Sequence, residues 1–190
     1  MERALSATAA LAGLLALLAP AGPAAAGAAL GKQRLSGRYA LGDRERSAAA
    51  IRAAVDRATE RMALLRGVAR ARLYETSEPA PRLELGFPEG QIRVAQAGEA
   101  PVVTPDDGRP AAWTSRFGDT TTVVQTYRRG KLVQTFRGAM GSLRTDVYTL
   151  SPDARRLTVR SAITSAFLPE AVEFEVIYDR EQARALGGSP

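Results

Sequence analysis

Apolar and polar residues alternate with a period of two along most of the chain after residue 80. Short runs with this alternation are separated by turn pairs such as Glu89-Gly90, Asp107-Gly108 and Arg129-Gly130. Such alternation predicts strands that bury one side and expose the other. Because the spacers are too short for helical crossovers, neighbouring strands are expected to pair antiparallel. The predicted strands are 37–41, 82–87, 91–97, 101–104, 111–117, 120–128, 131–138, 143–150, 156–167 and 172–179.

A helical period replaces the alternation between residues 47 and 66. Ile51, Val55 and Ala58 recur at spacings of four and three, and charged residues lie between them. The spacing predicts one amphipathic helix over 47–66, whose narrow, alanine-rich apolar face favours core packing over membrane or partner binding. Beyond Gly67 the pattern fits either another strand or a continuation of the helix. The fold class is therefore mainly β (α+β), an antiparallel meander that forms a barrel or strongly curved sheet packed on one long N-terminal helix.

One hairpin can be placed in register from the sequence. The pentamers 123–127 and 132–136 are nearly identical and flank Arg129-Gly130. A tight turn there pairs Tyr127 with Leu132, and two residues further on it pairs Gln125 with Gln134. The aromatic side chains on this face predict that it points inward.

The first 28 residues are typical of a cleaved signal peptide. Arg3 supplies the positive end, a leucine-dense stretch follows, and small residues near Ala26 or Ala28 suit a signal peptidase. A membrane anchor is the alternative, although prolines and alanines dilute the apolar run. The prediction is a periplasmic or secreted protein of a Gram-negative bacterium, with one domain over 29–180 and a flexible C-terminal tail over 181–190.

The chain of 190 residues contains no histidine and no cysteine. It therefore has no imidazole base, no thiolate nucleophile, no disulfide and none of the usual zinc or iron-sulfur ligands. The pair Asp106-Asp107 precedes Gly108 and is predicted to form a turn. No catalytic residues, metal ligands or cofactors are predicted, so the protein is expected not to be an enzyme. An isomerase or cyclase that relies on Tyr, Asp or Glu alone stays open.

The predicted inner faces carry few bulky residues and several polar ones, which is consistent with an interior that holds a ligand. The alternative is an interior filled by the helix, with the glutamines bonded to each other. The predicted ligand-lining residues combine aromatic contact area with groups that orient a polar head: Gln125, Tyr127, Gln134, Phe136, Ser161 and Phe174.

The net charge is +6, and arginines recur in the predicted strands and turns of the second half. They are expected either to face solvent or to form a patch for an anionic membrane, lipopolysaccharide or another partner. Few aromatic residues and an export signal argue against nucleic acid. The residues predicted for the patch are Arg116, Arg128, Arg129, Arg137, Arg144 and Arg160.

The start Gly37-Arg38-Tyr39, followed by the meander, resembles secreted bacterial lipocalin-like proteins of the calycin group, in which a tryptophan usually stands where Tyr39 is. The resemblance implies a barrel that binds a small apolar molecule without a cofactor. The expected function is non-catalytic binding of a small hydrophobic or amphipathic ligand in a β-barrel cavity. The alternative is an envelope protein that docks through an arginine-rich face.

Overall fold

The computed structural model describes residues 23–62 and 66–182. The predicted signal peptide up to residue 22 and the predicted tail from residue 183 lie outside the described residues. The helices are α1 (Pro23–Leu35), α2 (Arg44–Thr59) and α3 (Arg66–Ser77), with a short 3-10 turn η1 (Ala139–Gly141). The strands are β1 (Gly37–Leu41), β2 (Arg82–Gly86), β3 (Gln91–Gln96), β4 (Val102–Pro105), β5 (Ala111–Thr114), β6 (Thr120–Arg128), β7 (Lys131–Arg137), β8 (Leu143–Leu150), β9 (Arg156–Thr164) and β10 (Val172–Arg180).

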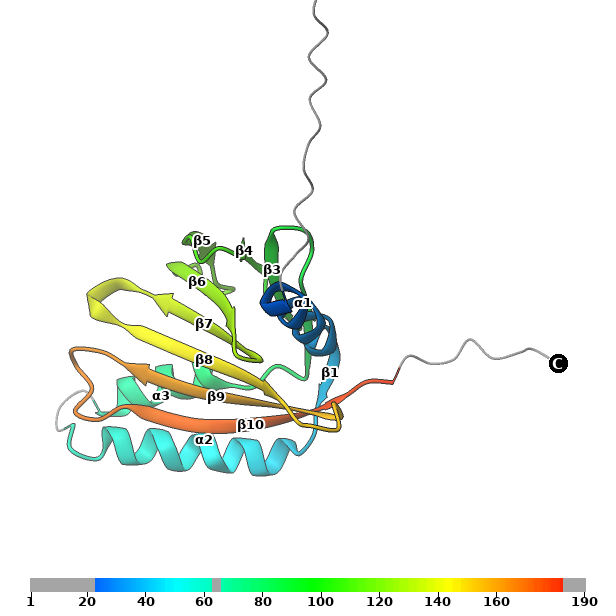
Figure 1. Cartoon of the computed structure of the whole chain (residues 1–190). Coiled ribbons are helices and arrows are strands. Elements are labelled where there is room, and N and C mark those ends of the chain that lie inside the picture. The colour runs from blue at the N-terminus through cyan, green and yellow to red at the C-terminus, as the bar shows by residue number, and fades with distance from the viewer. Residues whose placement is uncertain (1–22, 63–65, 183–190) are drawn as a thin grey trace, which may run out of the picture.

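The ten strands form one antiparallel sheet in the order β4-β3-β2-β1-β10-β9-β8-β7-β6-β5. Because β1 lies between β2 and β10, the first and last strands are neighbours and the meander curls into a nearly closed barrel (Figure 1). The predicted fold class is confirmed. The two edges are β4 and β5, which follow each other in the chain without pairing.

The sequence-predicted register of the β6–β7 hairpin is confirmed. Tyr127 lies opposite Leu132, and Gln125 opposite Gln134. Arg129 and Gly130 both have positive φ, of 51° and 76°, as a two-residue hairpin turn with the twist of its strands requires.

The helical region differs from the prediction of one helix over 47–66. Helix α2 begins at Arg44 and ends at Thr59, and α3 follows where an alternating pattern had left a strand possible. Asp43 caps α2 because its carboxylate accepts a hydrogen bond from the Arg46 amide at 2.9 Å. The apolar face of α2, which includes Ile51 and Val55, is buried in the core that also holds the inner side of β10.

Helix α1 lies at the end of the barrel where the β6–β7 turn is found (Figure 1). Leu35 is buried in the core, and the Lys32 ammonium forms an ion pair of 2.8 Å with Asp106 after β4. Gly31 faces the Tyr127 hydroxyl, and a Cβ atom at this position would push the end of the tyrosine side chain away. The barrel is thus filled at the α1 end.

Candidate functional site

The barrel holds a partly open cavity of about 1230 Å³ on the side of α3. Its apolar wall includes Val94, Trp113, Phe136, Phe174 and Val176. The Trp113 and Phe136 rings meet edge to face at 5.5 Å between centroids. A cavity of this size and lining is suited to a lipid-sized molecule.

Four polar side chains form a row across the inner face of β6 to β9. The strand register places Gln125 beside Gln134, Gln134 beside Asp146, and Asp146 beside Ser161. Inner positions on neighbouring strands lie at the same level of a sheet, so the four side chains form a continuous polar row. All four are at most 4% exposed.

Most acceptors of the row have partners within the protein. Thr104 Oγ1 donates to Gln125 Oε1 at 3.0 Å, and the Tyr148 hydroxyl donates to Gln134 Oε1 at 2.7 Å. The amide nitrogens Nε2 of both glutamines are buried without a hydrogen-bond partner in the described part of the chain. Buried amides nearly always find a partner, so these two donors are exceptions within the described residues.

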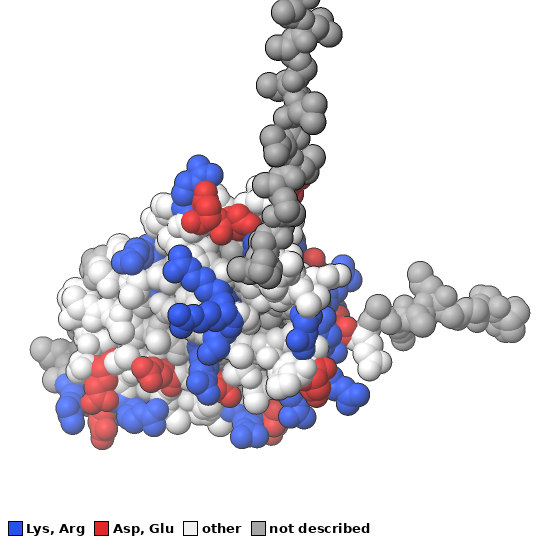
Figure 2. Space-filling model, in the orientation of Figure 1, with Lys and Arg blue, Asp and Glu red and all other residues white. Residues whose placement is uncertain are grey.

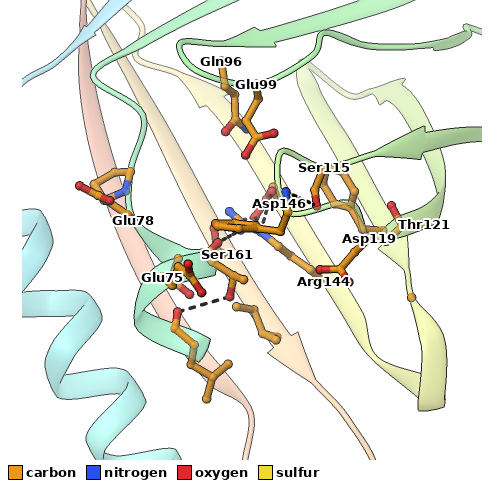
Figure 3. A pocket seen from close by; sticks show the side chains of 18 of the residues that line it. Glu75, Glu78, Gln96, Glu99, Ser115, Asp119, Thr121, Arg144, Asp146 and Ser161 are labelled. Atoms are coloured by element: carbon orange, nitrogen blue, oxygen red, sulfur yellow. Dashed lines mark hydrogen bonds and ion pairs between the residues drawn. The ribbon is translucent and has the colours of Figure 1, made fainter. Parts of the chain in front are cut away.

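Asp146 is the centre of a buried polar cluster on the cavity wall (Figure 3). Its carboxylate accepts a hydrogen bond of 2.6 Å from Ser161 Oγ and one of 3.0 Å to each oxygen from Arg144 Nε. Arg144 Nη1 also donates to the Thr76 carbonyl oxygen at 2.9 Å, which links β8 to the last turn of α3. The cluster therefore ties the wall of the cavity to the helix that covers it.

The surroundings raise the pKa of Arg144 and the pKa values of the two tyrosines near it. Burial alone lowers the pKa of Arg144, but the Asp146 carboxylate outweighs that effect and the pKa lies above its ordinary value. Burial raises the pKa of Tyr148 well above the ordinary value, and Asp146 raises it further. Burial also raises the pKa of Tyr178, which lines the cavity nearby. Both phenols can therefore donate hydrogen bonds at neutral pH.

Each arginine that lines the cavity forms an ion pair with a carboxylate that also lines it. The pairs are Arg44–Glu78, Arg72 with Glu75 and Asp119, Arg116–Glu99, and Arg144–Asp146. Together the described lining residues carry four arginines and five carboxylates. The cavity therefore presents no excess positive charge.

The six predicted ligand-lining residues fall into two groups. Phe136, Ser161 and Phe174 line the cavity. Gln125 and Gln134 are completely buried in the polar row, and their oxygens bond to Thr104 and Tyr148 instead of to each other. Tyr127 lies at the α1 end, where its ring contacts Phe87 edge to face. Contact of all six with a ligand stays a prediction.

Sequence reasoning missed Arg144, Asp146, Tyr148 and Tyr178 as cavity residues. The missing signal was the register of β7 with β8, which places Asp146 opposite the inward Gln134. Arg144 is two residues before Asp146 and hence on the same face. Its side chain lines the cavity and pairs with Asp146, and its predicted part in a patch for an anionic partner stays a prediction.

The other predicted patch arginines come from several strands and turns of the sheet. Arg116 pairs with Glu99 and Arg160 with Glu175, whereas Arg128 and Arg129 are at the β6–β7 turn and Arg137 ends β7. Figure 2 shows basic side chains gathered over the middle strands on one face, with acidic ones nearby. Docking to an anionic membrane or partner stays a prediction.

The described residues 23–62 and 66–182 contain the helices α1, α2 and α3. None of the helices there has the length and apolar character needed to cross a membrane. No group of three or more carboxylates within this part of the chain is placed to hold a metal ion.

The comparisons with known proteins give a likeness of fold. No protein-family model matches the chain, and no curated protein matches it in sequence. The REP1-NXSQ fatty acid transporter has a TM-score of 0.50 at 14% identity, over 80% of this chain and 99% of its own. The apo form of Caenorhabditis elegans lipid binding protein 8 has a TM-score of 0.51 at 12% identity, over 78% and 96%. A Schistosoma mansoni fatty acid binding protein in complex with arachidonic acid has 0.51 at 13%, over 80% and 99%. The likeness supports the predicted antiparallel barrel as a fold.

Proposed function

We propose that this protein is an exported, non-catalytic carrier of a small hydrophobic or amphipathic molecule, which it holds inside the barrel. The observation that carries the proposal is the cavity of about 1230 Å³, whose wall is mostly apolar and includes Asp146 and Ser161 of the polar row. Ligand sites of this kind combine a mostly apolar lining with a few polar groups that fix orientation. The similar solved structures include proteins named for fatty acid or lipid binding.

The residues of the cavity support binding over catalysis. With no histidine or cysteine in the chain, the groups left for acid-base work are carboxylates, tyrosines and basic side chains. Asp146 is occupied by Arg144 and Ser161, and the pKa of Tyr148 is far above neutral pH. The phenol is therefore not poised to exchange a proton near pH 7, and the carboxylate already has two hydrogen-bond partners.

The test uses Trp113, the single tryptophan of the chain, which lies on the cavity wall. Protein stripped of bound lipid should show a saturable change in Trp113 fluorescence when a long-chain lipid is added, and native mass spectrometry should show one molecule retained. The variant Trp113→Phe is the control, because any remaining signal would come from light scattering by lipid. Absence of both the fluorescence change and the retained mass for every lipid class would refute the carrier function.

Export has its own test. Cleavage near Ala26 or Ala28 would remove the start of α1 and keep Lys32 and Leu35, which attach this helix to the barrel. The sequenced N-terminus of the protein from its bacterial host should therefore fall at residues 27–29 in the periplasmic or secreted fraction. An intact Met1 in the cytoplasmic fraction would contradict export.

A further inference from the structure

The charges of the cavity bear on which head group a ligand carries. A lipid that binds through a free carboxylate must lose its hydration, and burying an anion is costly unless a cation or several donors replace that hydration. A ligand with a free carboxylate would therefore need, in the cavity lining, a cation that is not already paired.

Arg144 is a cation of the cavity lining, and the Asp146 carboxylate already neutralises its charge. Arg144 gives its Nε to both oxygens of Asp146, and its Nη1 to the Thr76 carbonyl. Asp146 is only 1% exposed, so water screens its negative charge poorly. An anionic head group next to Arg144 would also lie next to this buried carboxylate, and the two would repel each other.

The remaining arginines of the lining are also paired. Arg72 binds Glu75 and Asp119, Arg116 binds Glu99, and Arg44 binds Glu78, with the Arg44 and Glu78 side chains 80% and 57% exposed. These pairs bring at least as many carboxylates as arginines. They give a carboxylate ligand no second anchoring point within the described lining.

The lining does offer a neutral donor. Tyr178 lines the cavity, and burial keeps its phenol protonated. Gln125 Nε2 and Gln134 Nε2 are also unpartnered in the described chain, but neither glutamine lines the cavity. Donors without a matching charge suit an uncharged acceptor, such as a carbonyl oxygen.

We propose that the cavity selects an uncharged long-chain lipid with a carbonyl at its polar end, such as an ester, and discriminates against the free fatty carboxylate. The proposal rests on the carrier function proposed above. Asp146 is the residue that sets the preference, because it cancels the charge of Arg144. The similar structures named for fatty acids do not show which head group this chain prefers.

The experiment compares two ligands of equal chain length, laurate and methyl laurate, at pH 7.5 and below the micelle concentration of laurate. Each competes with the uncharged dye Nile red, and Trp113 fluorescence gives a second readout. Methyl laurate is expected to bind at least about tenfold more tightly than laurate, a difference of about 1.4 kcal/mol. Equal binding, or tighter binding of laurate, would overturn the preference. If neither ligand nor the dye binds, the carrier function itself fails.

The variant Asp146→Asn tests the cause. It keeps the shape of the side chain and releases the charge of Arg144, so laurate affinity is expected to rise at least about tenfold while methyl laurate affinity changes less. Glu175→Gln is the matched control, because it removes one carboxylate from the outer face of β10, where Glu175 pairs with the exposed Arg160. The control should keep the wild-type preference. Unchanged laurate affinity in folded Asp146→Asn would refute the role of Asp146.

A double variant covers the case in which Asp146→Asn does not fold because Arg144 is left unpaired. Arg144→Met combined with Asp146→Asn removes both charges, and such replacements of buried pairs are often tolerated. This protein is expected to bind methyl laurate and to gain no affinity for laurate. A gain for laurate in the absence of both charges would contradict an electrostatic origin of the selectivity.

Discussion

At the scale of single residues, buried hydrogen bonds hold the polar row in place. The Tyr148 hydroxyl donates to Gln134 Oε1, and both side chains are at most 1% exposed. Water cannot readily replace such a donor, so losing it leaves an unsatisfied acceptor in the interior. The row therefore depends on the tyrosine as well as on the glutamine.

Tyr148→Phe is expected to lower the free energy of unfolding by about 1–3 kcal/mol, because Gln134 Oε1 loses its buried donor. Urea unfolding followed by circular dichroism measures the loss. Thr114→Val is the control, since it removes a hydroxyl from the exposed pair Thr114–Thr120 and should change the free energy by less than about 0.5 kcal/mol. Equal effects of the two variants would show that the Tyr148 bond contributes no more than an exposed one.

The raised pKa of Tyr39 predicts that the folded protein loses stability at high pH. Burial raises its pKa from 10.0 to about 12, although Arg180 acts in the opposite direction. The folded state thus holds the phenol proton more tightly than the unfolded state, so stability is complete below pH 10 and falls as the pH rises towards 12. The loss is about 1.4 kcal/mol for each pH unit in this window, roughly 3 kcal/mol in total.

The measurement is the free energy of unfolding between pH 8 and pH 11.5 for the wild type and for Tyr39→Phe. The variant should be less stable at pH 8, because it loses the 2.7 Å bond to the Leu35 carbonyl, and its pH slope should be smaller. Tyr148 and Tyr178 also have raised pKa values, so part of the slope should remain. Identical slopes would mean that Tyr39 does not titrate differently on folding.

At the scale of elements, the alternation of apolar and polar residues was enough to find the ten strands, most of them to within one residue at each end. Two strands were predicted three residues too long, since β5 ends at Thr114 and β9 at Thr164. The turns that follow these strands, around Gly118 and Ser165, contain apolar residues such as Phe117 and Phe167, which extended the apparent pattern.

Helix α3 could not be recognised from a buried stripe. Ser77 is its single fully buried residue among those described, and Val68 is 74% exposed. Contacts from elsewhere in the chain hold it: the Tyr74 hydroxyl donates to Asp56 of α2 at 2.6 Å, and Arg144 binds the Thr76 carbonyl. Such tertiary contacts override local pattern, and they leave no trace in the sequence spacing.

The N-terminal cap of α2 gives a prediction at this scale. Asp43→Ala is expected to cost about 1 kcal/mol, because the Arg46 amide loses its acceptor at the start of the helix. Asp43→Asn should keep most of the stability, since the amide oxygen can accept the same bond. Urea unfolding of the three proteins measures the difference. Equal losses for both variants would assign the effect to the charge of Asp43 instead of its capping bond.

At the scale of the whole molecule, the barrel is closed by side chains where its backbone is open. Strand β4 pairs with β3, and β5 with β6, but β4 and β5 do not pair with each other. Thr104 reaches Gln125, Trp113 Nε1 donates to the Ala100 carbonyl at 3.0 Å, and the Arg116 amide donates to Glu99. The sequence predicted either a barrel or a strongly curved sheet. The pairing of β1 with β10 joins the two halves of the meander into one sheet, which curls into a nearly closed barrel.

The gap between the unpaired edges of β4 and β5, here called the seam, predicts uneven hydrogen exchange across the sheet. Amides of β4 and β5 that face the seam lack a strand partner, so small openings should expose them, whereas β8, β9 and β10 have a partner on each side. The expected exchange rates at the seam are at least about tenfold higher than in β9, which NMR of the labelled protein measures residue by residue. A ligand that contacts Trp113 should slow exchange at the seam more than in β9, because it stabilises the side chains that bridge the gap. Equal protection of β5 and β9 in the free protein would mean that β4 and β5 pair in solution and that the barrel is fully closed.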